Sequence, residues 1–287
     1  VTDMGYMFRS ATDFNQCLST WADKTPPDVY TDYIFRGSSC PYQATYASIS
    51  PWCQGEDEQQ CSAPPCTIST VITANGNDFR DKVSDCLYDA SDCPDNVPIG
   101  CWDTSEVTDM ASAFYKQDSF NDSISRWNTA RVTSMSRMFG YANYFNQSLN
   151  AWNVSSVTDM YYMFYETYYF NKSLNDWNVS SVTTMEGMFN NAAYFNKLIN
   201  DWNVASVNNM NKMFYVAHEF DQPINDWNVS SVTSMRKMFW YTTPEHKGSC
   251  FNQPINDWNV ARVTDMSAMF TYCIFFDQSL NDWNVAS

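Results

Sequence analysis

A tryptophan recurs at a fixed interval along this 287-residue chain. The interval is 25 residues from Trp102 to Trp227, and the series returns at Trp258 after a longer step of 31 residues. A fixed period of this length indicates a repeat architecture, in which each unit packs only on its neighbours. We therefore expect a stack of coils whose core is a ladder of tryptophans, namely Trp102, Trp127, Trp152, Trp177, Trp202, Trp227, Trp258 and Trp283.

The other apolar residues keep the same register when each anchor tryptophan is numbered 0. From the coil of Trp127 onward, Phe stands at −7 and Ile or Leu at −3, and the complete coils carry Val at +5, Met at +8 and Phe at +12. The alternation around the tryptophan, as in SLNDWNV, predicts a short strand. The spacing in VTDMYYMF predicts a short helix or 3₁₀ segment. The sequence thus predicts an α/β solenoid with one short parallel strand and one short helix per 25-residue coil.

Asparagine forms further columns at positions −2 and +1 of successive coils. Stacked amides can hydrogen-bond from one coil to the next and satisfy turns that have no strand partner. We therefore interpret most of this asparagine as scaffold, and we expect the +1 side chains to form a buried column.

The pattern F-N-Q-x-I/L-N-x-W-N-V-S-x-V-T-x-M-x-x-M-F, present in residues 102–287 and 1–21, resembles the 25-residue repeat of the BspA-like surface-protein family. That repeat is related to the leucine-rich repeats and occurs in bacterial surface lipoproteins and in algal and protist extracellular proteins. The resemblance implies a right-handed, leucine-rich-repeat-like solenoid and an extracellular or cell-surface location. It implies no activity. The chain departs from ordinary leucine-rich repeats because Trp and Met fill its core.

The register breaks between Trp21 and Trp102, where seven of the ten cysteines lie. Helical spacing from Phe79 to Ala90 indicates a cap over the first coil. We divide the chain into the end of an array continuing from a preceding copy, a Cys-rich linker, a helical N-terminal cap and the solenoid array, at residues 1–40, 41–76, 77–101 and 102–287.

The even number of cysteines favours disulfides and an oxidising compartment. Cys250 and Cys273 fall at nearly the same height on consecutive coils, and we expect them to pair. The pairing of the remaining eight stays open: Cys17, Cys40, Cys53, Cys61, Cys66, Cys86, Cys93 and Cys101. Their spacing does not match the common zinc motifs, so no metal site is expected among them.

Six sequons of the form N-x-S/T predict N-linked glycans. Three lie at position −6, which we expect to be exposed and the preferred site: Asn121, Asn146 and Asn171. The other three lie at position +1: Asn153, Asn178 and Asn228.

The formal net charge is −16, from 32 acidic and 16 basic residues. An acidic chain argues against nucleic acid as a partner, and the lack of any run of about 18 apolar residues argues against membrane insertion. Both histidines stand alone, and the Asp repeated at −1 is scaffold rather than a unique acid/base pair, so we expect no enzyme and no cofactor. Calcium remains a weak candidate at the acidic run YDASDCPDN.

The two ends of the sequence share one register. Ser287 is position +4 of a coil, and Val1 supplies the residue due at +5, so the unit junction joins Ser287 to Val1 of another copy. We therefore expect a structural repeat unit of an extracellular, disulfide-stapled, N-glycosylated fibre or surface coat, assembled head to tail. The partners would be copies of itself, in the same chain or in neighbouring subunits, with surface glycans or matrix as further candidates. The alternative is an adhesin or receptor ectodomain that binds a ligand on the solenoid face.

Overall fold

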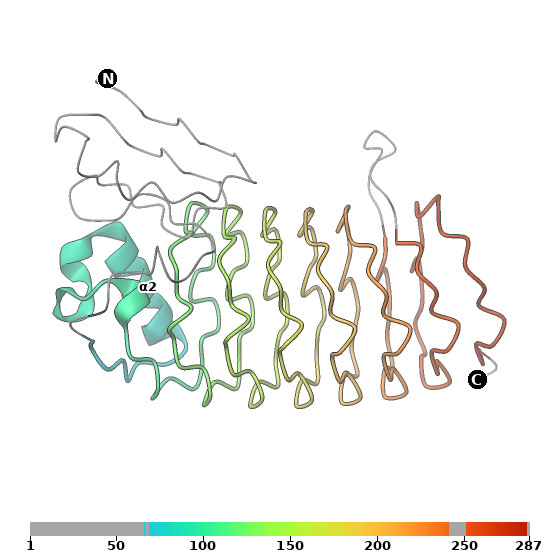
Figure 1. The fold of residues 1–287 in the computed structure, drawn as a ribbon, viewed down its shortest axis with the longest axis horizontal. Helices are drawn as coiled ribbons and strands as arrows, with labels where there is room; N and C mark the ends of the chain where they lie inside the picture. The colour runs from blue at the N-terminus through green and yellow to red at the C-terminus, as the bar shows by residue number, and fades with distance from the viewer. Residues whose placement is uncertain (1–65, 67–68, 241–250, 286–287) are drawn as a thin grey trace, which may run out of the picture.

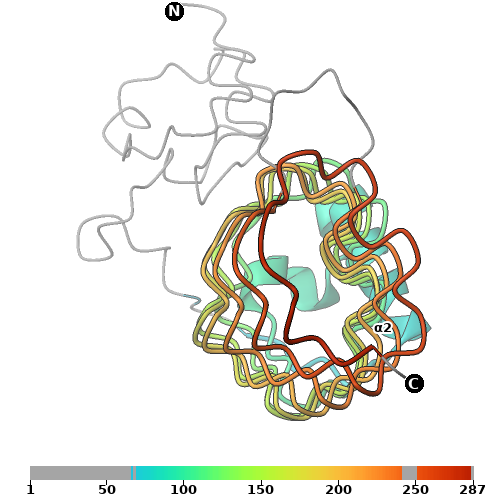
Figure 2. The ribbon, with the colours of Figure 1, turned by 90° about the vertical axis from the view of Figure 1, so that its right-hand side faces the viewer.

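The computed structural model describes Cys66, residues 69–240 and residues 251–285. From Trp102 onward the chain forms a row of similar coils laid side by side (Figure 1). Viewed along the row, the coils superpose around a shared interior (Figure 2). One end carries helix α2, Asn77–Tyr88, followed by three short 3-10 turns, η1 Ala90–Asp92, η2 Pro94–Asn96 and η3 Ile99–Cys101.

Consecutive coils are paired at position +7, which lies between the Val at +5 and the Met at +8. Each coil contributes one residue to a column of isolated parallel bridges, and a further bridge joins Val71 to Asp103; the column runs Asp109, Ser134, Asp159, Thr184, Asn209, Ser234 and Asp265. The expected strand around the tryptophan is therefore not present. In its place are a turn and an extended stretch, and the parallel pairing falls in the segment expected to be helical.

The segment from +8 to +14 is a run of tight turns with bonds from residue i to residue i−3, and not a continuous helix. Successive N–H groups donate alternately to the next coil and to a carbonyl of the same coil. In the coil of Trp127, the N–H groups of Arg137 and Phe139 donate to Tyr161 and Met163 of the next coil, at 2.8 and 2.9 Å, whereas Met138 N–H donates back to Met135 at 3.1 Å. A helix keeps all such bonds within one segment, so a chain that shares every second amide with its neighbour cannot be helical.

This alternation places positions +10 and +14 in the left-handed region of backbone space. Most of the residues there are not glycine: Ser112, Lys116, Arg137, Tyr141, Tyr162, Glu166, Asn191, Lys212, Val216, Lys237, Ala268 and Tyr272. A left-handed conformation costs a non-glycine residue roughly 1–2 kcal/mol. The bonds between coils and the burial of Met and Phe at +8, +11 and +12 offset that cost.

The tryptophans form the expected ladder. The rings of Trp127 and Trp152 stack with centroids 6.4 Å apart and planes 2° apart. The same stacking joins Trp102 to Trp127, Trp177 to Trp202, Trp202 to Trp227, and Trp258 to Trp283. Each indole N–H from Trp127 to Trp283 donates to the −3 carbonyl of the preceding coil, as Trp152 Nε1 does to Ile124 at 3.1 Å. All eight rings except Trp283 are buried. The right-handed, leucine-rich-repeat-like class of the stack stays a prediction.

Candidate functional site at the ends of the stack

The first coil is closed by the segment 70–76, which lies along it like a partial coil. Ile72 N–H donates to the Asp103 carbonyl at 2.9 Å, and Asp103 N–H donates to the Thr70 carbonyl at 2.8 Å. The side-chain oxygen of Asn75 accepts from the amides of Thr108 and its neighbour at 2.6 and 3.1 Å. Gly76 N–H also donates to the Asp109 carbonyl at 2.9 Å, so this segment pairs part of the edge that a preceding coil would otherwise occupy.

Helix α2 covers the core behind that edge. Phe79 and Val83 are fully buried. The ring of Phe79 stands edge-on to Trp102 and Trp127, with centroids 6.3 and 5.5 Å away. In the view along the stack, α2 lies behind the ring of coils (Figure 2). The helix therefore supplies the apolar contact that a preceding coil would otherwise make.

The last coil, which carries Trp258 and its +8 to +14 segment, is not closed in this way. The amides of Met266, Ala268, Phe270 and Tyr272 have no acceptor among the described residues. Equivalent amides one coil earlier donate onward, as Met235 N–H does to Asp265 at 2.9 Å. The last coil therefore presents a row of four unpaired donors on alternate residues.

The same end exposes part of the core. Five apolar side chains that pack on the core are only half-buried here, in contrast to their counterparts in the inner coils: Met266, Phe270, Phe276, Leu280 and Trp283. We call these five residues, with the amides of Ala268 and Tyr272, the open face. In the inner coils the following coil bonds to the equivalent amides and buries the equivalent side chains. A further coil of the same pattern would cover the open face in the same way.

The sequons are exposed in the opposite order to the one expected. At position −6, Asn121 and Asn146 are 2% and 8% exposed. Their side-chain oxygens accept the −6 amide of the following coil, Asn146 N–H at 2.7 Å and Asn171 N–H at 3.0 Å, so this position is an inner ladder and not a preferred glycan site. Asn171 is half-buried.

Position +1, expected to be buried, is exposed at all three sequons, Asn153, Asn178 and Asn228. Each side-chain oxygen there caps a turn of its own coil, as Asn153 does for the Ser155 amide at 3.1 Å. These bonds use the oxygen and not the nitrogen that a glycan would occupy.

The ladder between coils at −2 involves the aspartate at −1. Asn175 Nδ2 donates to Asp201 of the next coil at 2.6 Å, and Asn150, Asn225 and Asn256 make the same bond. The repeated aspartates are thus engaged in hydrogen bonds that join coils.

The described cysteines are all in disulfides. Cys66 pairs with Cys101, and Cys86 pairs with Cys93, across the linker and the cap. Cys273 is also disulfide-bonded, but its expected partner lies outside the described residues, as do the other cysteines of the N-terminal part: Cys250, Cys17, Cys40, Cys53 and Cys61. Within the described ranges, no group of three or more His, Cys, Asp or Glu side chains could hold a metal ion.

The unit junction, Val1 and Ser287, also lies outside the described residues. In the part of the chain that is described, no helix combines the length and the apolar character needed to cross a bilayer.

Comparison with protein families finds one repeat family on both sides of the Cys-rich segment. The family model described as "Mycoplasma protein of unknown function, DUF285" matches residues 1–39, 82–202, 171–248 and 194–287. The chain belongs to the DUF285 family. The matched segments take in the helix α2 from its middle onward and every coil of the stack. Comparison with curated proteins and with solved structures gave no match.

Proposed function

We propose that this DUF285 chain is a structural module of an extracellular fibre or surface coat, in which coils of the same pattern cover the open face. The observation that supports this most directly is the row of unpaired amides at Met266, Ala268, Phe270 and Tyr272 beside a half-buried ring of core residues. A row of edge donors is a template for pairing with another chain, and exposed apolar core is favourably covered by another surface.

The covering coil in this proposal is the one carrying Trp21, supplied by another copy in the same chain or in a neighbouring subunit. Residues 1–39 match the same family model as the coils beyond residue 82, which supports a repeat array on each side of the Cys-rich segment. In the proposed array, α2 and its disulfides close one stretch of coils, and the open face continues into the next.

The extracellular setting is part of the same proposal. The disulfides Cys66–Cys101 and Cys86–Cys93 are typical of oxidising compartments, and the BspA-like resemblance points to the same place. We place the glycans at Asn153, Asn178 and Asn228, because these are the exposed sequons. An intact-mass shift on glycosidase treatment that disappears in the triple Asn→Gln variant supports this placement.

Self-association of the 287-residue chain tests the main proposal. Sedimentation velocity across a concentration series should show oligomers that grow with concentration, and electron microscopy should show them as rods. Hydrogen exchange at Met266, Ala268, Phe270 and Tyr272 should slow as the oligomers form, whereas the amide of Lys237, already bonded to Ser267 at 3.0 Å, should not change.

A matched pair of leucine variants locates the contact. Leu280→Asp places a charge on the open face, and Leu198→Asp places the same charge on a lateral surface where Leu198 is 50% exposed. We expect Leu280→Asp to weaken association at least roughly tenfold, the scale of one lost apolar contact, and Leu198→Asp to leave it unchanged. A chain that stays monomeric at all concentrations, with fast exchange at the four amides, would favour the adhesin alternative.

A further inference from the structure

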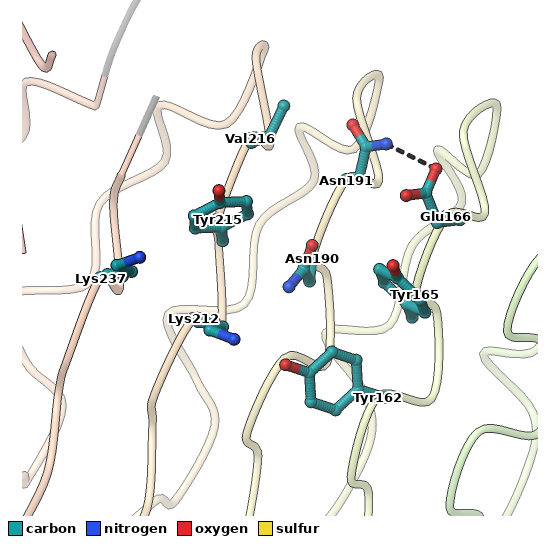
Figure 3. A pocket seen from close by; sticks show the side chains of 9 residues that line it. All are labelled: Tyr162, Tyr165, Glu166, Asn190, Asn191, Lys212, Tyr215, Val216 and Lys237. Atoms are coloured by element: carbon teal, nitrogen blue, oxygen red, sulfur yellow. Dashed lines mark hydrogen bonds between the residues drawn. The ribbon is translucent and has the colours of Figure 1, made fainter. Parts of the chain in front are cut away.

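A hollow of about 370 Å³ lies on the side of the stack, across the coils of Trp152, Trp177, Trp202 and Trp227 (Figure 3). Its lining comes from positions +10, +13 and +14 of these coils, and includes three tyrosines, two lysines, two asparagines and one glutamate. The hollow is remote in sequence from the open face, and its side chains belong to the variable positions of the repeat. It therefore needs an explanation of its own.

Gly187 stands at +10 of the coil between those of Tyr162 and Lys212, two residues that line the hollow. Its φ is +60°, but the same left-handed conformation is adopted by Lys212 and Ala268 at this position of other coils, so the backbone does not require glycine. A Cβ at residue 187 would lie 2.6 Å from the ring of Tyr162. The glycine is there for space, because the ring of Tyr162 lies over it.

The aromatic walls are held in place. Tyr215 stacks on Trp240 with centroids 4.6 Å apart and planes 1° apart. The hydroxyl of Tyr165 accepts from Tyr141 at 3.2 Å. Burial raises the pKa of the Tyr162 and Tyr215 phenols, so both stay neutral and able to donate at physiological pH. Fixed rings beside amides offer stacking faces and hydrogen-bond partners together, at little cost in side-chain entropy.

Charge is separated across the hollow. Lys212 and Lys237 lie on one side, half-buried, and neither has a carboxylate within ion-pair distance among the described residues. Lys237 Nζ lies 5.6 Å from the Trp240 ring centre. On the other side, Glu166 accepts from Asn191 Nδ2 at 2.6 Å (Figure 3). Acidic residues outnumber basic ones two to one in this chain, so two adjacent unpaired lysines are conspicuous.

One further carboxylate, Glu186, lies near the hollow on the side of Tyr162. Glu186 raises the pKa of Tyr162, which places it close to that ring, but its oxygen is taken by Asn209 Nδ2 at 2.8 Å. Both carboxylates are thus already hydrogen-bonded to asparagine amides, whereas the ammonium groups of Lys212 and Lys237 have no hydrogen-bond acceptor among the described residues.

We propose that the hollow binds an acidic saccharide, a pyranose that carries a carboxylate or sulfate group. The tyrosine rings contact the apolar faces of the sugar. Glu166 accepts hydrogen bonds from the sugar hydroxyls, and the asparagine amides exchange hydrogen bonds with them. Lys212 and Lys237 bind the anionic group. A neutral sugar lacks the contact with the two lysines, and a small inorganic anion lacks the contact with the tyrosine rings. The ligand therefore needs both a sugar ring and an anionic group.

Isothermal titration calorimetry with the whole chain tests this site, using tetragalacturonate as the carboxylated probe and a sulfated galactose tetrasaccharide as the sulfated one. A neutral galactose tetrasaccharide and inorganic sulfate are the controls. We expect one or both acidic saccharides to bind, and each control to bind at least roughly tenfold more weakly, the scale of one charge-assisted hydrogen bond. Equal binding of the neutral sugar, or no heat from either acidic probe at millimolar concentration, overturns the proposal.

Two variants connect binding to the named residues. The double variant Lys212→Gln, Lys237→Gln should lower affinity for the acidic probe at least roughly tenfold. Its control is Lys116→Gln, an exposed lysine 5.4 Å from the ring centre of Tyr115, which should bind like the parent. Unchanged affinity in the double variant contradicts the proposal.

Gly187→Ala tests the shape of the hollow independently of its charge. The new methyl group forces the Tyr162 ring aside, yet Ala268 shows that the backbone accepts alanine at this position. We expect an unchanged circular dichroism spectrum and lost saccharide binding. Retained binding in a folded Gly187→Ala protein contradicts the assigned role of Tyr162. Because the open face is not altered, self-association should be the same in all these variants.

Discussion

The two ends of the stack differ in how the core and the backbone groups of the terminal coil are covered. At the first coil, the segment 70–76 pairs with backbone groups of Asp103 and Asp109, and Phe79 packs against the tryptophan ladder. At the last coil, four amides and five core side chains have no such cover among the described residues. The first coil is thus covered by a segment outside the 25-residue pattern, with its own helix and disulfides, as terminal repeats of a solenoid commonly are.

The largest expected effect comes from removing a tryptophan inside the stack. Trp177→Ala should lower the free energy of unfolding by about 3–5 kcal/mol, because the ring is buried between two neighbours. Trp283→Ala, at the open face, should cost at most about half as much, because that ring has a neighbour on one side only. Urea unfolding of dilute protein measures both, and equal losses would mean that the open face is covered in solution.

Next in size is the apolar contact of the cap. Phe79→Ala should cost about 3 kcal/mol, since the ring is fully buried against two tryptophans. Phe275→Ala is the control near the other end, where the ring is 57% exposed, and should change stability by less than about 0.5 kcal/mol. Thermal and urea unfolding of the two variants give the comparison. Similar losses for both would contradict the contrast between the ends.

A smaller effect is expected from opening the capped edge. Asn75→Ala removes the acceptor of the amides at Thr108 and Asp109, and should cost about 1–2 kcal/mol. Hydrogen exchange at these two amides should speed up toward the rate seen at Ala268. The control is Asn203→Ala, which loses only a turn bond within its own coil, to Ala205, and should leave the Thr108 amide unchanged.

The smallest effect concerns pH. Hydrogen bonds from Ser105 lower the pKa of Asp103 at the capped end, and hydrogen bonds from Ser267 lower the pKa of Asp265 at the open end. A lowered folded-state pKa gives stability that is present above the unfolded pKa, near 3.8, and is lost as pH falls through the folded value. Carboxyl titration by NMR should place both below the usual Asp range. A shift at Asp103 alone would mean that the cap, and not the local turn, is the cause.

Much of this arrangement could be predicted from the sequence. The tryptophan ladder follows from the period, and the helix α2 follows from the spacing of Phe79, Val83 and Cys86, all of which are buried. The turns from +8 to +14 could not be predicted in the same way, because a left-handed backbone is normally signalled by glycine. Here residues such as Arg137 and Val216 adopt it, because the bonds to the next coil enforce it.

From the sequence we expect asparagine to be exposed at −6 and buried at +1, and the structure shows the reverse at most of these sequons. The reason is related. Asparagine at −6 and +1 looks the same in a single coil, but its partner is the next coil at −6 and its own turn at +1. One signal was available: position −6 alternates only between Asn and Asp, as at Asn196 and Asp221, and both supply an acceptor oxygen. The saccharide hollow left no comparable signal, since Gly187 and Lys212 stand at a position that varies from coil to coil.

The direction of the bonds between coils also restricts how copies of this chain can meet. The open face offers amide donors at Met266, Ala268, Phe270 and Tyr272, and donors cannot bond to donors. Stacking of a further coil pairs these donors with its carbonyls in the same way as inside the stack, where Met235 N–H donates to Asp265. In the proposed array such contacts are heterologous, and heterologous contacts either close into rings or continue without limit. If copies stack in line with their coils, the proposed fibre has one polarity.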